Sequence, residues 1–178
     1  MTMNFAAIIP AILQGYILPI DGLHGLAHWA RVLENGRRLA AETGANVDVV
    51  SLFAIFHDSR RVNEATDPLH GRRGADLAAE LRGRFFDLPD REFDCLYQAC
   101  VGHTRERTHS NLTIQVCWDS DRLDLGRVGI TPHPSRLCSE VAKRPDIIHW
   151  ADGRACFGII PMLILDEWKI DLQQVCSE

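Results

Sequence analysis

The stretch Val49-Val50-Ser51-Leu52-Phe53-Ala54-Ile55-Phe56-His57-Asp58 decides the fold, because seven apolar residues and one serine lead directly into a histidine and an aspartate. Such a run is buried in any fold, and burying a polar His-Asp pair is costly unless each side chain finds a partner. A metal cation is a partner for both. We therefore expect a buried helix over residues 47–58 that carries metal ligands at its C-terminal end.

Two histidines before this run are candidates for the same ion. His24 and His28 are four residues apart, so they share one face of any helix that covers both. His28 also shares its face with Val32 and Leu39, which points it inward, and we expect it to be a ligand. His24 stands near the helix start and is expected at the rim of the pocket or against the substrate. The alternative for either residue is a hydrogen-bonded core histidine.

The acidic segment at residues 118–124 offers carboxylates. On a helix, Asp119 and Asp121 point about 200° apart, so they cannot serve one ion together. Asp121 has the apolar neighbours on its face and is the expected ligand. Asp124 lies one turn further on and is expected to support Asp121 or to pair with Arg127. The alternative is a solvated acidic face.

These donors are nitrogen and oxygen atoms, which suit Mn, Fe, Co, Ni, Zn or Mg and do not suit a metal that prefers thiolates. None of the six cysteines forms a C-x-x-C pair, which argues against a zinc knuckle or a thioredoxin site. We expect free thiols in a reducing cytosol, and three disulfides are the alternative.

Helical spacing of apolar residues recurs along the chain, without convincing period-two alternation. We expect helices at residues 26–43, 47–58, 68–81, 88–101 and 113–125, and one kinked helix or two helices over 147–175. The apolar N-terminal stretch, residues 5–20, is expected to be a helix that packs on the core or on a partner subunit. The prediction is an all-α, single-domain helical bundle over residues 1–178, with its core at about 24–130.

Length and charge narrow the function classes. The chain has 178 residues, a net charge of −5 and 46% hydrophobic residues, as expected for an ordinary globular protein. The negative charge argues against binding to a nucleic-acid polymer. The N-terminal apolar stretch is too short to span a bilayer and no basic residue precedes it, so we expect no membrane association and a cytoplasmic location.

The order His28, His57-Asp58, Asp121 resembles the HD superfamily of metal-dependent hydrolases. The strings that carry the resemblance are His28-Trp-Ala-Arg-Val32, Leu52-Phe-Ala-Ile-Phe-His57-Asp58 and Asp119-Ser-Asp121-Arg-Leu-Asp124. The resemblance covers about residues 24–130 and implies an HD-type helical bundle with a divalent metal centre. It does not specify the substrate, because this superfamily includes nucleotidases, phosphodiesterases and oxygenases.

The resemblance also bears on the number of metal ions. His70 and His103 occur near the positions where two-metal members of the superfamily carry extra ligands. The implied layout makes Asp58 a bridge, with His28, His57 and Asp121 on one ion and His70 and His103 on the other. The alternative is a single ion, with His70 and His103 binding the substrate phosphate.

In one respect the chain departs from its relatives. One-metal nucleotidases that resemble this family carry a Glu three residues after the Asp, where this chain has Arg61, so their catalytic arrangement does not carry over. Arginines near the motif in sequence are Arg60, Arg61, Arg72, Arg73, Arg105 and Arg107. We expect Arg61 or Arg72 to bind the substrate phosphate.

The sequence thus predicts a phosphohydrolase that uses metal-activated water on a small phosphorylated molecule, such as a nucleotide or another phosphoester. The predicted catalytic residues are Asp58, His24 and Arg61, and His24 or His103 would protonate the leaving group. Two alternatives remain, a di-iron oxygenase of the HD type and a metal- or nucleotide-binding module without catalysis. The apolar terminal segments also leave a homo-oligomer open.

Overall fold

The computed structural model describes residues 3–172, which form eight α-helices and two short 3₁₀ helices. Their bounds are α1 Phe5–Leu13, α2 Leu26–Thr43, α3 Val47–Phe56, α4 His70–Leu81, α5 Asp90–Gly102, α6 Leu112–Arg122, η1 Leu125–Val128, η2 Pro134–Arg136, α7 Pro145–Cys156 and α8 Leu163–Asp166. Over these residues an isolated bridge between Arg82 and Phe86 is the one strand-like contact. The predicted all-α fold is confirmed.

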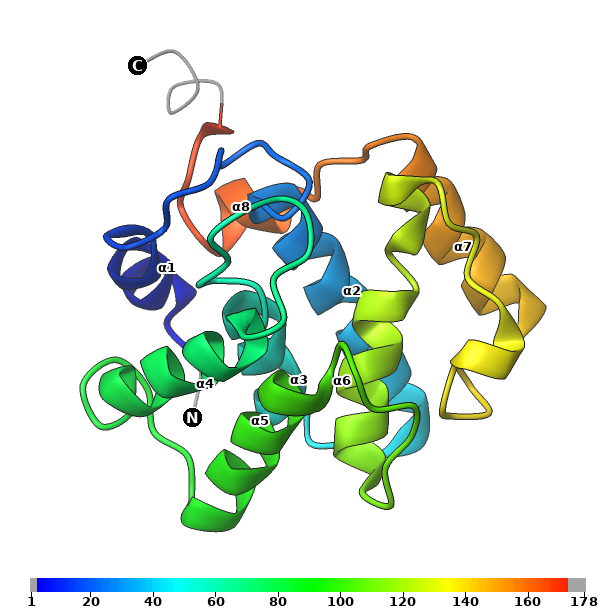
Figure 1. Cartoon of the computed structure of the whole chain (residues 1–178), viewed down its shortest axis with the longest axis horizontal. Coiled ribbons are helices and arrows are strands. Elements are labelled where there is room, and N and C mark those ends of the chain that lie inside the picture. The colour runs from blue at the N-terminus through cyan, green and yellow to red at the C-terminus, as the bar shows by residue number, and fades with distance from the viewer. Residues whose placement is uncertain (1–2, 173–178) are drawn as a thin grey trace.

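Helix α3 lies in the middle of the molecule, where α2, α4, α5 and α6 contact it (Figure 1). Every residue from Val49 to Phe56 is buried, as its apolar sequence predicts. The helix starts at Asn46, whose side chain accepts hydrogen bonds from the backbone amides of Asp48 and Val49. A helix that is buried from Val49 onward thereby carries the His57-Asp58 pair at its end.

Two glycines allow α4 to come close to its neighbours. A β-carbon on Gly74 would lie 2.1 Å from the carbonyl oxygen of Phe56, and one on Gly71 would lie 2.1 Å from that of Cys100. Neither position therefore has room for a side chain. This close approach brings the first residue of α4, His70, to the ends of α3 and α5.

Several helix ends differ slightly from those expected. The helix at 26–43 has its predicted bounds and stops at Gly44, which has a φ of 77°. The helix predicted at 47–58 ends at Phe56, so Asp58 lies in the following turn, and α4 begins at His70 after a turn that contains Pro68. The segment 147–175 forms two helices, α7 and α8, and its end at Val175 lies outside the described residues.

The helix predicted at 113–125 also ends early, at Arg122. The backbone amide of Asp124 donates to the carbonyl oxygen of Asp121 in a tighter turn, which leads into η1. Asp124 therefore lies outside α6, and its carboxylate contacts His28 and Arg31 of α2.

The terminal segments complete one hydrophobic cluster that contains residues from α1 to α8. In α1, Phe5, Ile8, Ile9 and Ile12 are buried, so this apolar helix packs on the core. No helix within residues 3–172 is long and apolar enough to cross a membrane. The free thiols in this range are Cys95, Cys100, Cys117, Cys138 and Cys156, and Cys176 lies outside it.

Candidate metal centre

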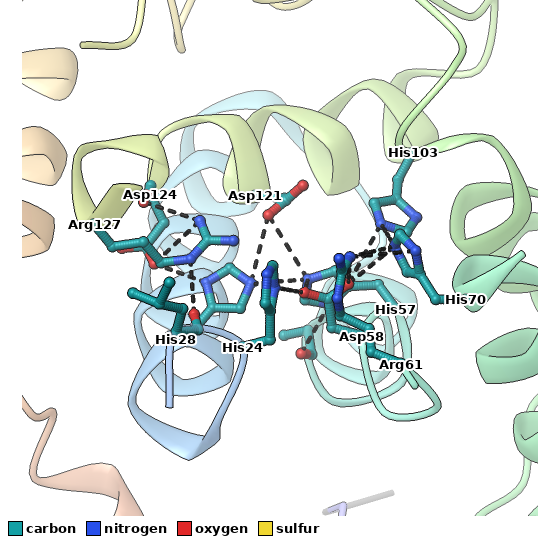
Figure 2. Close-up of polar contacts among 12 residues, drawn as sticks. His24, His28, His57, Asp58, Arg61, His70, His103, Asp121, Asp124 and Arg127 are labelled. Atoms are coloured by element: carbon teal, nitrogen blue, oxygen red, sulfur yellow. Dashed lines mark hydrogen bonds and ion pairs between the residues drawn. The ribbon is translucent and has the colours of Figure 1, made fainter. Parts of the chain in front are cut away.

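The six side chains predicted as ligands come together from five places in the chain (Figure 2). His28 comes from α2, His57 and Asp58 from the end of α3, His70 from the start of α4, His103 from the end of α5 and Asp121 from α6. All are buried except Asp121, whose side chain is 17% exposed. We call these six residues the His/Asp cluster.

One half of the cluster surrounds the Nε2 atoms of His28 and His57, which lie 3.1 Å apart. The nearer carboxylate oxygen of Asp121 is 3.6 Å from the first nitrogen and 3.7 Å from the second. An oxygen of Asp58, Oδ2, lies 3.6 Å and 3.8 Å from the same two atoms. Ligand atoms about 2.1 Å from one ion are roughly 3.0–3.4 Å apart at common coordination angles. The two imidazole nitrogens lie in this range, and both carboxylate oxygens lie slightly beyond it, so a shared cation would draw the carboxylates inward.

The other half lies around the second oxygen of Asp58, Oδ1. This atom is 3.1 Å from Nε2 of His70 and 3.7 Å from Nε2 of His103. The two imidazole nitrogens are 2.9 Å apart. The carboxylate of Asp58 therefore turns one oxygen to each half, as a carboxylate that bridges two cations would.

The four imidazoles of the cluster share one orientation. Each directs Nδ1 to an oxygen that can only accept, namely Asp124 Oδ2 for His28, the Phe53 and Ala54 carbonyls for His57, the Asp67 carbonyl for His70 and the Cys100 carbonyl for His103. Nδ1 therefore carries the proton in the neutral ring, and the Nε2 lone pair points into the cluster. This fixed tautomer is the arrangement that metal-binding histidines adopt.

The charges of the cluster also favour a cation. Burial lowers the pKa of His57 to about 3, so its imidazole is neutral at pH 7. Burial alone would raise the pKa of Asp121, but the nearby imidazoles of His57 and His28 lower it to about 2. The pKa of Asp58 is likewise held well below its usual range by the surrounding imidazoles, against the effect of burial. Neutral imidazoles and ionised carboxylates are the protonation states that bind metals.

His24 belongs to the same region but is oriented differently. Its Nδ1 donates to Oδ2 of Asp58 over 2.6 Å, and its Nε2 lies 3.6 Å from Oε2 of Glu64. This Glu64 oxygen is buried without a hydrogen-bond partner. The free lone pair of His24, on Nε2, thus points toward Glu64 and away from the cluster. His24 therefore positions the Asp58 carboxylate. Helical periodicity does not single out Glu64, because it lies in the irregular segment between α3 and α4.

The two arginines expected at the phosphate lie in different places. Arg61 is buried, and its Nη1 is 3.3 Å from both ring nitrogens of His70 and 3.6 Å from Oδ1 of Asp58. The side chain of Arg72 is 60% exposed and pairs with Asp76, so of the two arginines Arg61 is the one that lies at the cluster. Arg72 lies two positions after His70 on α4, which turns their side chains about 200° apart.

Asp124 and Asp119 fix the surroundings of the cluster. Asp124 accepts from Nδ1 of His28 over 2.7 Å and from Nε of Arg31 over 2.6 Å, and Arg127 lies 3.8 Å away.

Asp119 points away from the cluster, as predicted, but it is buried and not solvated. Its carboxylate accepts from the backbone amides of Cys138 and Ser139. It thereby holds a segment that lies almost twenty residues further along the chain.

A structural comparison supports the same fold. No family model matches the chain, and no curated protein matches it. The crystal structure of a predicted HD superfamily hydrolase from an uncultured Thermotogales bacterium is similar to it, with a TM-score of 0.65 and 22% identity over 93% of this chain and 94% of that chain. The chain therefore has the helical fold of the HD superfamily, as its sequence motifs predict.

Proposed function

We propose that this protein is a metal-dependent hydrolase that removes phosphate from a small phosphorylated molecule. The observation that carries the proposal is the orientation of the cluster, in which four imidazole Nε2 atoms face the two oxygens of Asp58. The fold of a predicted HD superfamily hydrolase supports it.

The donor atoms fit one or two divalent cations. His28, His57, Asp58 and Asp121 would hold one ion, and Asp58, His70 and His103 would hold the other. A divalent ion supplies activated water, by lowering its pKa from 15.7 to about 7, and neutralises charge on a phosphoryl oxygen. His24 and Arg61 touch Asp58 from outside the six ligands, where His24 would hold or pass a proton and Arg61 would orient the phosphate.

The space beside the cluster supports a small substrate. A cavity of about 420 Å³ is lined by His103 and Asp121 from the cluster and by residues of the α5–α6 loop and η2. Cavities that bind small molecules are typically about 300–1,000 Å³. A polymer would need a longer groove, so the proposed substrate is a nucleotide-sized phosphoester.

The test compares the wild-type protein with Asp58→Ala and with the control Asp94→Ala, which removes an exposed carboxylate on α5. Metal content is measured in protein purified without chelator, and turnover is measured on p-nitrophenyl phosphate with added Mn²⁺. The wild type and the control should retain metal and hydrolyse the ester, and Asp58→Ala should lose both. An Asp58→Ala protein with full metal content and turnover would refute the proposal.

The same donors would also suit two irons, so the assays are repeated without air. Turnover that continues without dioxygen supports the hydrolase. Turnover that needs dioxygen and two irons would point to an oxygenase instead. A protein that holds metal but hydrolyses no phosphoester with any of the divalent ions would be a binding module.

A further inference from the structure

The cavity beside the His/Asp cluster is unusual in its charge. Its charged lining consists of Arg105, Arg107, Arg122 and Arg136, with Glu106 and the cluster residue Asp121 as its acids. The chain as a whole carries a net charge of −5, so this concentration of arginine runs against the overall charge. A local surplus of positive charge beside a catalytic centre attracts anions.

One of these arginines has a structural task. Arg122 donates to three backbone carbonyl oxygens, those of Glu106 at 2.5 Å, Arg107 at 2.9 Å and Arg136 at 3.0 Å. These contacts join the α5–α6 loop to η2, two segments that are almost thirty residues apart in sequence. Arg122 thereby holds the two sides of the cavity wall together. Because its Nη1 and Nη2 groups already donate to carbonyl oxygens, it has few N–H donors left for a ligand.

The side chains of the other three arginines have no partner within the described residues. Within residues 3–172, the guanidinium groups of Arg105, Arg107 and Arg136 have no hydrogen-bond or ion-pair partner, although all three line the cavity. Most other arginines near the cluster are engaged, as Arg31 is with Asp124 and Arg73 is with Asp67. The cavity therefore holds three guanidinium groups that pair with no acidic side chain, although Glu106 and Asp121 also line it.

We propose that this cavity binds a second phosphate group of the substrate. The inference rests on the proposed function and narrows its substrate class to small molecules with two separate phosphates. One phosphate lies at the His/Asp cluster, beside His103 and Asp121, and the other is bound by Arg105, Arg107 and Arg136. Guanidinium groups suit this task because their paired N–H donors match phosphate oxygens and their charge persists at all physiological pH values.

The first test measures anion binding without catalysis. Inorganic pyrophosphate is titrated by calorimetry into chelator-treated protein, so that no metal contributes. The variant is Arg107→Gln with Arg136→Gln, and the control is Arg84→Gln with Arg91→Gln, which removes the same charge from exposed positions outside this cavity. We expect unchanged binding in the control and about tenfold or weaker binding in the cavity variant. Equal affinities in the two variants would overturn the proposal.

The second test uses two matched substrates, the monophosphate and the bisphosphate of propane-1,3-diol. In the cavity variant, the ratio of KM for the bisphosphate to KM for the monophosphate should rise about tenfold over the wild-type ratio. Equal changes for both substrates would overturn the second-phosphate site. If neither ester is hydrolysed but pyrophosphate still discriminates between the variants, the proposed hydrolase fails and the anion site stands.

Discussion

Nδ1 of His28 lies 2.7 Å from Oδ2 of Asp124, and the same carboxylate accepts from Nε of Arg31 over 2.6 Å. Arg31 therefore fixes Asp124, and Asp124 fixes the tautomer and the ring orientation of His28. A ligand that is held in place before the metal arrives loses less entropy on binding.

The substitution Asp124→Asn should weaken metal binding while the fold persists. The amide can present its NH₂ group to His28 and no longer compensates the charge of Arg31. We expect the affinity for the ion at His28, His57 and Asp121, here called the first ion, to fall about 10–100-fold. This is measured by competition with a chromogenic chelator. The control Asp94→Asn, at an exposed site, should bind as the wild type does. An unchanged affinity in Asp124→Asn would show that Asp124 does not support His28.

The substitution Gly71→Ala should disrupt the half of the cluster that contains His70 and His103. Its methyl group would meet the Cys100 carbonyl at 2.1 Å and the His103 ring at 3.0 Å, so α4 must move away from α5. His70 and His103 would then part, and we expect one ion per chain instead of two by metal analysis. The free energy of unfolding should fall by about 1–3 kcal/mol.

The matched control for this change is Gly153→Ala. This glycine lies inside α7 with open space around its α-carbon, so alanine should stabilise the helix by about 0.5–1 kcal/mol and leave the metal content unchanged. Two ions in Gly71→Ala would contradict the role given to the close approach of α4.

Removal of the Arg61 charge should strengthen binding of the second ion, the one at Asp58, His70 and His103. The guanidinium is 3.3 Å from His70 and 3.6 Å from Asp58, so its positive charge repels a cation between them. Like charges about 4 Å apart repel by about 4 kcal/mol at an effective dielectric constant of 20, which is more than a tenfold change in affinity. Arg61→Gln should therefore bind the second ion more tightly by calorimetry, and the control Arg61→Lys should not. Unchanged metal binding with a raised KM in Arg61→Gln would instead mark Arg61 as a phosphate ligand only.

The second ion should be lost on mild acidification. Burial alone would lower the pKa of His103, but the nearby carboxylates of Asp58 and Asp121 raise it above the usual value of about 6.5. In the metal-free protein the imidazole is thus protonated below that raised pKa, and it must lose this proton before it can bind a cation. The affinity should fall about tenfold per pH unit below the pKa. Metal analysis after dialysis between pH 8 and pH 5 checks this, and a constant content of two ions would contradict it.

The sequence predicts the centre of the fold well, for a physical reason. The run 49–56 can only be buried, and a polar pair at its end must then be partnered, so α3 and the pair His57-Asp58 follow from local information. The inward direction of His28 follows equally from helical periodicity. The structure brings these residues together, and the identity of the metal stays a prediction.

Other features depend on contacts between distant segments. The partners of Asp124 are His28 and Arg31 on α2, and the partners of Asp119 at residues 138 and 139 lie in an irregular segment. The choice between Arg61 and Arg72 likewise needs the structure, because Arg72 is near His70 in sequence but its side chain is exposed and pairs with Asp76. The glycines at 71 and 74 are visible in the sequence, but the carbonyl oxygens that require them belong to other helices.

Arg122 holds the wall of the cavity through carbonyl oxygens, which every amino acid possesses. The shape of that wall is therefore indifferent to which side chains stand at positions 105, 107 and 136. Evolution or mutagenesis can therefore replace those three residues and so change the preferred substrate, while the scaffold and the metal ligands remain as they are.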